Sequence, residues 1–397
     1  MSNDYEQRFE KAGAYHASGD IPAASKIYAE LLSEQPDNDI VQYYNALADF
    51  DLGQHAKAIN TLKCIIKRLP EISKIRLELA KMLEREGDYP AALIQFEKAL
   101  SFDPNDLESL IMSGHMYTQT KKLPEAINRY KKALGHVPSN HATRVALTRA
   151  LMLQGDWGEA DQQCVQILQA VPGHTGAMAL HSIICFELGR DDDARKIMNF
   201  EDRLIPRTFE PEGGLDAMNL RLADAIANHP TIAYEPKDYS TKCGYHTGDI
   251  TGDTSGPIFE LLTWVRSEID AIITECQANA KDPFSKRAPA SYSLNAWGVV
   301  MEDQGHQDSH IHRDAWISGV YYIKVPASVH RDDPESTGWI EFGTPHDYSE
   351  RKTVSEIKLI MPEAGNAILF PAYFYHRTIP LRSSDTRICI AFDAIPQ

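Results

Sequence analysis

The sequence predicts a multidomain protein in which an all-α repeat solenoid precedes a jelly-roll domain with flanking helices. Two observations support this prediction. Three residue types recur at a fixed spacing of 34 residues through the first half of the chain, and apolar residues change from helical to alternating spacing in its last part. The length of 397 residues fits this division, because a single hydrophobic core rarely serves more than about 250–300 residues.

Alanine, proline and glycine each recur every 34 residues. The alanines are Ala24, Ala58, Ala92, Ala126, Ala160 and Ala194; the prolines are Pro36, Pro70, Pro104, Pro138 and Pro172; the glycines are Gly19, Gly53, Gly87, Gly155 and Gly189, with Lys121 at the remaining position. Each unit is expected to hold two helices joined by a turn at the glycine. The small alanine lets the helices approach closely, and the proline ends the second helix.

This pattern resembles the tetratricopeptide repeat family over about residues 5–200. The family's usual Trp and Tyr of the first helix are mostly replaced, while its small position is kept by Ala46, Ala80 and Gly114. The resemblance implies an array of about five and a half 34-residue repeats, residues 1–200, whose concave surface binds a protein or peptide partner. A rigid spacer or a dimerisation surface is the alternative use of such an array.

Composition argues against several classes of function. The formal net charge of −16 is opposite in sign to what a nucleic-acid binder or a protein docked on anionic membrane would carry. No apolar run approaches the ~18 residues of a membrane-spanning helix. The cysteines are scattered without zinc or disulfide spacing, and the acidic N-terminus does not resemble a signal peptide. We therefore expect a cytoplasmic protein that binds neither nucleic acid nor membrane.

The repeat register ends after Met198, and the following residues, 201–235, are expected to form a linker with a short helix over Asp216–Ala227. Helical spacing returns over Ile258–Ala278. From Ser291 onward seven candidate strands follow: 291–301, 316–325, 338–342, 356–361, 366–370, 377–380 and 387–394. Short strands joined by Gly and Pro turns, without helices between them, predict a jelly roll in the last domain, residues 236–397.

Chemistry-bearing residues gather directly before one of these strands. Three histidines and two aspartates lie between His306 and Asp314, and imidazoles with carboxylates at the start of a strand suit Fe(II) or Mn(II). A later histidine, His376, is followed by Arg387 eleven residues further on. Because a jelly roll brings strands that are distant in sequence side by side, these residues can converge on one pocket.

These motifs resemble those of the 2-oxoglutarate/Fe(II) dioxygenases, in their bacterial, prolyl-hydroxylase-like branch. The matching segments are His310-Ile-His312, Ser318-Gly-Val-Tyr-Tyr322, Gly338-Trp-Ile-Glu-Phe342, Pro362 with Gly365, Leu369-Phe-Pro371 and His376. The resemblance covers roughly residues 290–397. It implies a double-stranded β-helix that hydroxylates a protein or peptide substrate with O₂, Fe(II) and 2-oxoglutarate, and ascorbate is a further candidate cofactor. The alternative is a non-catalytic scaffold protein with a degenerate oxygenase barrel.

The resemblance also implies the metal ligands, which are His310, His312 and His376, with Asp314 as an alternative ligand. Both His310-x-His312 and His312-x-Asp314 have the spacing that places two side chains on one face of a strand, so the sequence leaves this choice open. No catalytic residue is implied beyond the ligands of the metal and the cosubstrate.

Four residues are candidates for binding 2-oxoglutarate. Arg387 is expected to hold its distal carboxylate through a two-pronged guanidinium contact. Tyr321 and Tyr322 are candidates to add a hydroxyl, but neighbouring residues of a strand point to opposite faces, so only one of them points inward. Trp297 is assigned to the wall of the same pocket.

Overall fold

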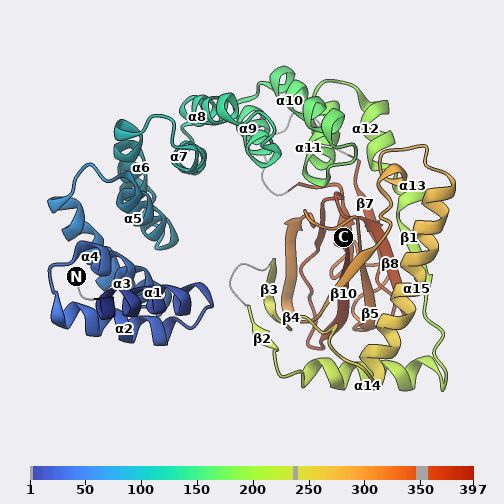
Figure 1. The fold of residues 1–397 in the computed structure, drawn as a ribbon. Coiled ribbons are helices and arrows are strands. Elements are labelled where there is room, and N and C mark those ends of the chain that lie inside the picture. The colour runs from blue at the N-terminus through green and yellow to red at the C-terminus, as the bar shows by residue number, and fades with distance from the viewer. Residues whose placement is uncertain (1–2, 236–239, 346–355) are drawn as a thin grey trace. The chain divides into compact units, whose positions relative to one another are not determined.

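The computed structural model describes residues 3–235, 240–345 and 356–397 (Figure 1). It confirms the predicted fold class, because a helical repeat solenoid in the N-terminal part is followed by a curled antiparallel sheet in the C-terminal part. The chain divides into two compact units, residues 1–154 and 155–397. None of the helices in the described ranges has the length and apolar content that crossing a membrane requires.

The first unit consists of paired antiparallel helices with short turns between them. They are α1 (Asn3–Ala17), α2 (Ile21–Glu34), α3 (Asp39–Asp51), α4 (His55–Arg68), α5 (Ser73–Arg85), α6 (Tyr89–Phe102), α7 (Leu107–Gln119), α8 (Leu123–His136) and α9 (His141–Gln154). The recurring alanines of this unit are fully buried. The turn glycines have positive φ, and Lys121 adopts φ 58° at the equivalent place, a conformation that is costly for a side chain. The 34-residue spacing therefore marks both the helix contacts and the turns.

The second unit begins at residue 155 and so includes the last helices of the repeat array. Its helices are α10 (Trp157–Ala170), α11 (Thr175–Glu187), α12 (Asp191–Met198), α13 (Phe200–Arg203), α14 (Leu215–Ala227) and α15 (Gly256–Ala278), with a short 3₁₀ turn at Ser285–Arg287. In α11, 11 of 13 residues are buried. A helix that is apolar on all sides needs partners on all sides, and α11 finds them in its repeat neighbours and in the sheet domain.

The sheet contains ten strands within the described residues, and all of its neighbouring strands there are antiparallel. They are β1 (Ile205–Thr208), β2 (Ala233–Tyr234), β3 (Thr241–His246), β4 (Tyr292–His310), β5 (Ile317–Lys324), β6 (Ile340–Phe342), β7 (Lys358–Ile360), β8 (Asn366–Pro371), β9 (His376–Thr378) and β10 (Arg387–Pro396). The main path runs β1-β8-β5-β10-β4-β9-β6-β7. Each of the seven strands expected after Ser291 overlaps one of β4 to β10.

Residues 201–235, expected to be a linker with a short helix, supply an edge strand and a covering helix to the sheet domain. In β1, Ile205 lies opposite Leu369 of β8. An edge strand tolerates Pro206, because proline only removes a hydrogen bond that the outer edge does not use. Helix α14 matches the expected helix and crosses the lower end of the sheet in Figure 1, whereas α15 runs beside the strands. Helix α14 packs so closely that a Cβ on Gly298 would come within 2.6 Å of Ile226.

Candidate metal and cosubstrate site

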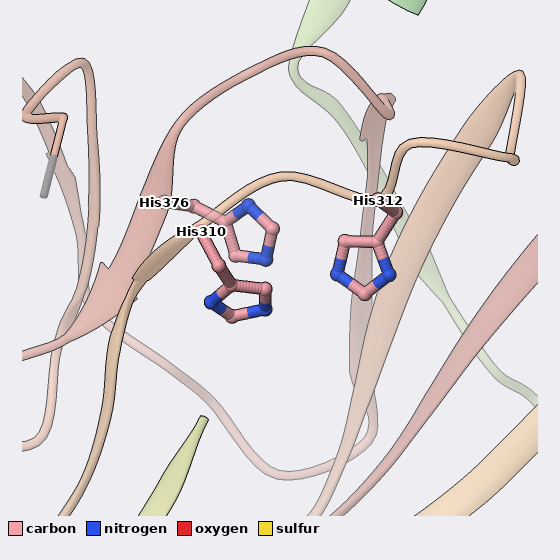
Figure 2. Close-up of side chains that lie close together, drawn as sticks. All are labelled: His310, His312 and His376. Atoms are coloured by element: carbon pink, nitrogen blue, oxygen red, sulfur yellow. The ribbon is translucent and has the colours of Figure 1, made fainter. Parts of the chain in front are cut away.

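Three histidines meet at the ends of β4 and β9. His310 ends β4 and lies opposite His376, the first residue of β9, while His312 follows in the next turn. The ring centroids of His310 and His376 are 4.3 Å apart, and the His312 ring lies 5.0 and 5.2 Å from them. Figure 2 shows the His310 and His376 rings together, with His312 facing them. One ring nitrogen of each lies within 4.8 Å of the other two, which is close enough for one metal ion.

The Nδ1 atom of each ring is already occupied by a hydrogen bond. His310 Nδ1 lies 2.7 Å from the carbonyl oxygen of Asp308, and His376 Nδ1 lies 3.0 Å from that of Phe374. His312 Nδ1 lies 2.8 Å from Oδ2 of Asp393. Because these oxygens accept, each Nδ1 carries the proton and donates it, which leaves the Nε2 lone pair for a metal.

Burial keeps two of these imidazoles neutral. It lowers the pKa of His310 to about 4, and the nearby His312 ring lowers it further. Burial, with the two neighbouring rings, also holds the pKa of His376 well below its usual range. A metal binds the neutral imidazole, so these two ligands would take up an ion near neutral pH without first losing a proton.

Asp314, the alternative ligand, is exposed and lies outside this group. The two-residue spacing from His312 places two side chains on one face only while the chain is a strand. Here the chain has left β4 and turns, with Ala315 N donating to the carbonyl of His312. The spacing rule therefore does not bring Asp314 to the group, and His312, which also lies beyond β4, joins His310 through the path of the turn.

The carboxylate that does reach the site is Asp393, which the sequence analysis missed. It is buried on β10, where it lies opposite Ser318 of β5 and accepts a 2.6 Å hydrogen bond from the Ser318 hydroxyl. The sequence does indicate that Asp393 lies on the same face of β10 as Arg387, because residues 387, 389, 391 and 393 alternate along one strand.

Arg387 is buried at the start of β10 and has unused hydrogen-bonding capacity. One of its NH groups donates to the carbonyl of Gly338 at 3.0 Å, and its guanidinium lies 5.0 Å from the centre of the Tyr322 ring. Arg387 Nε, the Tyr322 hydroxyl and Trp339 Nε1 are buried and have no hydrogen-bond partner within the described residues. Buried polar atoms are rarely left unpaired, so this group suits an anionic ligand with several acceptor oxygens.

The two tyrosines divide as strand alternation requires. Tyr322 faces Arg387, and its burial raises the pKa of its hydroxyl. Tyr321 points to the opposite face, where its hydroxyl donates to Asn219 Oδ1 of α14 at 2.7 Å. The expected cosubstrate role of Tyr321 is therefore not supported by its position.

Trp297 stacks on two imidazoles, one of which is His312 of the three-histidine group. Its ring is nearly parallel to that of His312, at 5.8 Å, and to that of His246 on the other side, also at 5.8 Å. Trp297 Nε1 has no hydrogen-bond partner among the described residues. The place of Trp297 in a pocket wall stays a prediction, and His246 of β3, which stacks on it, was not singled out from the sequence.

Family comparisons agree with the geometry. A family model described as "Putative 2OG-Fe(II) oxygenase" matches residues 295–393, a range that contains all three histidines and Arg387. A tetratricopeptide repeat model matches residues 43–106.

Curated proteins match this chain over short regions. A surface lipoprotein assembly modifier from Moraxella catarrhalis is 37% identical over 83 residues, which are 21% of this chain and 16% of that protein. The protein CTR9 homolog of Arabidopsis thaliana is 24% identical over 200 residues, 50% of this chain and 17% of that protein. The chain therefore spans less than a fifth of the length of these two relatives.

Solved structures resemble the chain at low identity. A tetratricopeptide repeat protein from Parabacteroides merdae is 17% identical, with 56% of this chain and 88% of that one covered and a TM-score of 0.44. The MamA protein is 18% identical, with coverage of 43% and 92% and a TM-score of 0.39. The assignment therefore rests on the two family matches and on the curled antiparallel sheet: this chain combines a tetratricopeptide repeat region with a domain of the 2OG-Fe(II) oxygenase family.

Proposed function

We propose that this protein is an iron- and 2-oxoglutarate-dependent dioxygenase, a hydroxylase of a protein or peptide substrate that the repeat array recruits. The observation that carries the proposal is the group of three imidazoles, each with Nδ1 occupied and Nε2 available. Neutral imidazoles of this kind suit Fe(II). His310, His312 and His376 would hold the metal, which in this chemistry activates O₂ while 2-oxoglutarate is oxidised to succinate and CO₂.

The unpaired polar atoms around Arg387 fit the cosubstrate. Its guanidinium would hold the distal carboxylate of 2-oxoglutarate by charge-assisted hydrogen bonds, which are about twice as strong as neutral ones. The Tyr322 hydroxyl would donate a further hydrogen bond. Aromatic rings pack beside two of the histidines: the Phe370 ring lies 4.7 Å from that of His376, and the Trp297 ring stacks on that of His312.

The repeat array is the part of the chain that would bind the substrate. Solenoids of this family present extended surfaces that suit a peptide or another protein, and the chain contains such a repeat region next in sequence to the oxygenase domain. We place the partner on the concave surface of the array and the protein in the cytoplasm.

Anaerobic titration of the full-length protein tests this function. Fe(II) with 2-oxoglutarate should produce a visible charge-transfer band, and in air the protein should convert 2-oxoglutarate to succinate. His376→Ala should abolish both signals. His306→Ala should preserve them, because His306 lies outside the three-histidine group. A folded wild-type protein with neither the band nor 2-oxoglutarate turnover would refute the proposal.

A non-catalytic scaffold is the second candidate. Its support is that no carboxylate belongs to the ligand group in the described part of the chain, which differs from the usual two-histidine, one-carboxylate triad. The oxygenase and the scaffold hypotheses predict different effects of His376→Ala in cells. If the barrel is degenerate, His376→Ala preserves the cellular function while the fold survives, whereas the oxygenase proposal requires its loss.

A further inference from the structure

Asp393 is a buried carboxylate whose surroundings contain no strong cation. Its side chain is 11% exposed, and its two oxygens accept from His312 Nδ1 at 2.8 Å and from the Ser318 hydroxyl at 2.6 Å. Within the described ranges no Lys or Arg forms an ion pair with it. An imidazole and a hydroxyl carry no permanent charge, and hydrogen bonds from them only partly offset the cost of removing a carboxylate from water. A cation bound on the opposite side of the His312 ring would complete the charge balance.

The three histidines differ in the charge of the group that accepts from their Nδ1 atoms. His310 and His376 donate to backbone carbonyls, which are neutral, whereas His312 donates to an anion. A carboxylate behind an imidazole fixes the orientation of the ring and makes its other nitrogen a stronger base. The three-imidazole group has no negative charge of its own, and Asp393 brings one to it from behind His312.

We propose that Asp393 is a positioning residue that stands in for the missing carboxylate ligand: it orients His312 toward the metal and supplies the site's negative charge from behind the ring. This inference rests on the proposed function, in which the three histidines bind a divalent metal. It also makes His312 and Asp393 a matched pair. An aspartate at position 312 would place two carboxylates at the same contact without a proton donor between them, and their repulsion would oppose ionisation of both.

Cobalt(II) binding to the full-length, metal-free protein tests the pair without requiring turnover. Affinity is measured by calorimetry, and the ligand geometry is followed through the visible d–d bands of cobalt. Asp393→Asn keeps the shape and one acceptor oxygen but removes the charge. We expect it to weaken cobalt binding by about 10-fold, and Asp393→Ala by up to about 100-fold, each with a change in the d–d bands. Asp314→Asn is the matched control, because it removes an exposed carboxylate two residues from His312 that is outside the group.

A rescue experiment separates positioning from a purely structural role. His312→Asp alone should bind cobalt poorly because its carboxylate meets that of Asp393. The double variant His312→Asp/Asp393→Asn should recover binding, since the amide can donate to the new carboxylate. Loss of stability in Asp393→Asn alone does not explain such a rescue, so the double variant remains informative even if the single variant folds poorly.

The cobalt measurements test the role of Asp393 separately from metal binding by the three histidines. If wild type and Asp314→Asn bind cobalt and Asp393→Asn binds with the same affinity and spectrum, Asp393 has no positioning role, and the metal site stands without it. A double variant that binds no better than His312→Asp alone would also overturn the pairing. If the wild-type protein does not bind cobalt, the proposed metal site itself fails.

Discussion

The end of the repeat array packs against Phe342 of β6 and against Phe374, two residues before His376, and Phe200→Ala tests whether this packing supports the site. Phe200 of α13 is 6% exposed, and its ring meets that of Phe374 edge-on at 5.1 Å. It also lies 6.3 Å from Phe342, which is opposite His376 in the sheet register and 6.0 Å from its ring. The substitution removes a buried ring whose two neighbours flank a proposed metal ligand.

The expected loss follows from the size of the buried side chain. Phe→Ala substitutions in cores lower the free energy of unfolding by about 3–5 kcal/mol, because the transfer free energy is lost and a cavity remains. An edge-to-face aromatic pair adds about 0.5–1.5 kcal/mol beyond buried area, which places Phe200 in the upper part of that range. The cavity already beside it is only about 10 Å³, so the surrounding side chains are closely packed. Their partial relaxation into the new space should also weaken cobalt binding at the histidines.

Tryptophan fluorescence during denaturant unfolding measures this loss selectively. All five tryptophans lie in the second unit, the first at Trp157 and the last at Trp339, so the signal does not report on the first unit. Phe102→Ala is the control, because Phe102 is 49% exposed and belongs to the first unit. A Phe200→Ala protein that unfolds at the wild-type denaturant concentration and binds cobalt equally well would refute the reasoning.

Three further predictions concern the site itself. Arg387→Lys keeps the positive charge but loses the two-pronged guanidinium contact. The affinity for 2-oxoglutarate, measured by calorimetry, should therefore fall about 10–100-fold, which corresponds to the loss of one charge-assisted hydrogen bond. An unchanged affinity would show that Arg387 does not bind the cosubstrate. Tyr322→Phe should weaken 2-oxoglutarate binding about 5-fold. Tyr321→Phe should leave this binding unchanged, because the Tyr321 hydroxyl donates to Asn219 on the other face of the strand. Equal effects of the two substitutions would contradict the placement of the tyrosines on opposite faces. Burial lowers the pKa of His310 from 6.5 to about 4, so between these pH values the unfolded chain binds more protons than the metal-free folded protein. The free energy of unfolding should therefore fall as the pH drops through this window, and His310→Asn should reduce that pH dependence.

Sequence periodicity predicted the helices and turns of the repeats but not where the compact units divide. The recurring alanine and glycine report contacts within a repeat, which are the same in every unit. They contain no information on what the last repeat packs against. The composition of α11 did contain this information. A helix with apolar residues on all sides must be covered on all sides, so α11 could not be a terminal helix with one face in solvent. Pro206 lies in the segment expected to be a linker, and an edge strand accommodates a proline as well as a linker does.

The site was predictable as far as motif order and strand alternation extend. The motifs gave His310, His312, His376 and Arg387, and the structure brings the three histidines together, although metal binding by them stays a prediction. Strand alternation places Asp393 on the same face of β10 as Arg387, but it does not identify the partner of this carboxylate. Its contact with His312 depends on which residue of β10 passes behind a turn that follows β4, and that is set by three-dimensional register rather than by spacing.

Two hydrogen bonds join the last repeat helices to the segments that carry the histidines. The Thr175 hydroxyl at the start of α11 donates to the carbonyl of Ala315, three residues after His312, at 3.2 Å. The Tyr373 hydroxyl, three residues before His376, donates to the carbonyl of Ile197 in α12 at 2.9 Å. The first bond holds the backbone just after His312, and the second holds the Tyr373 side chain just before His376. The terminal repeat helices therefore help to position the segments that carry two of the proposed ligands.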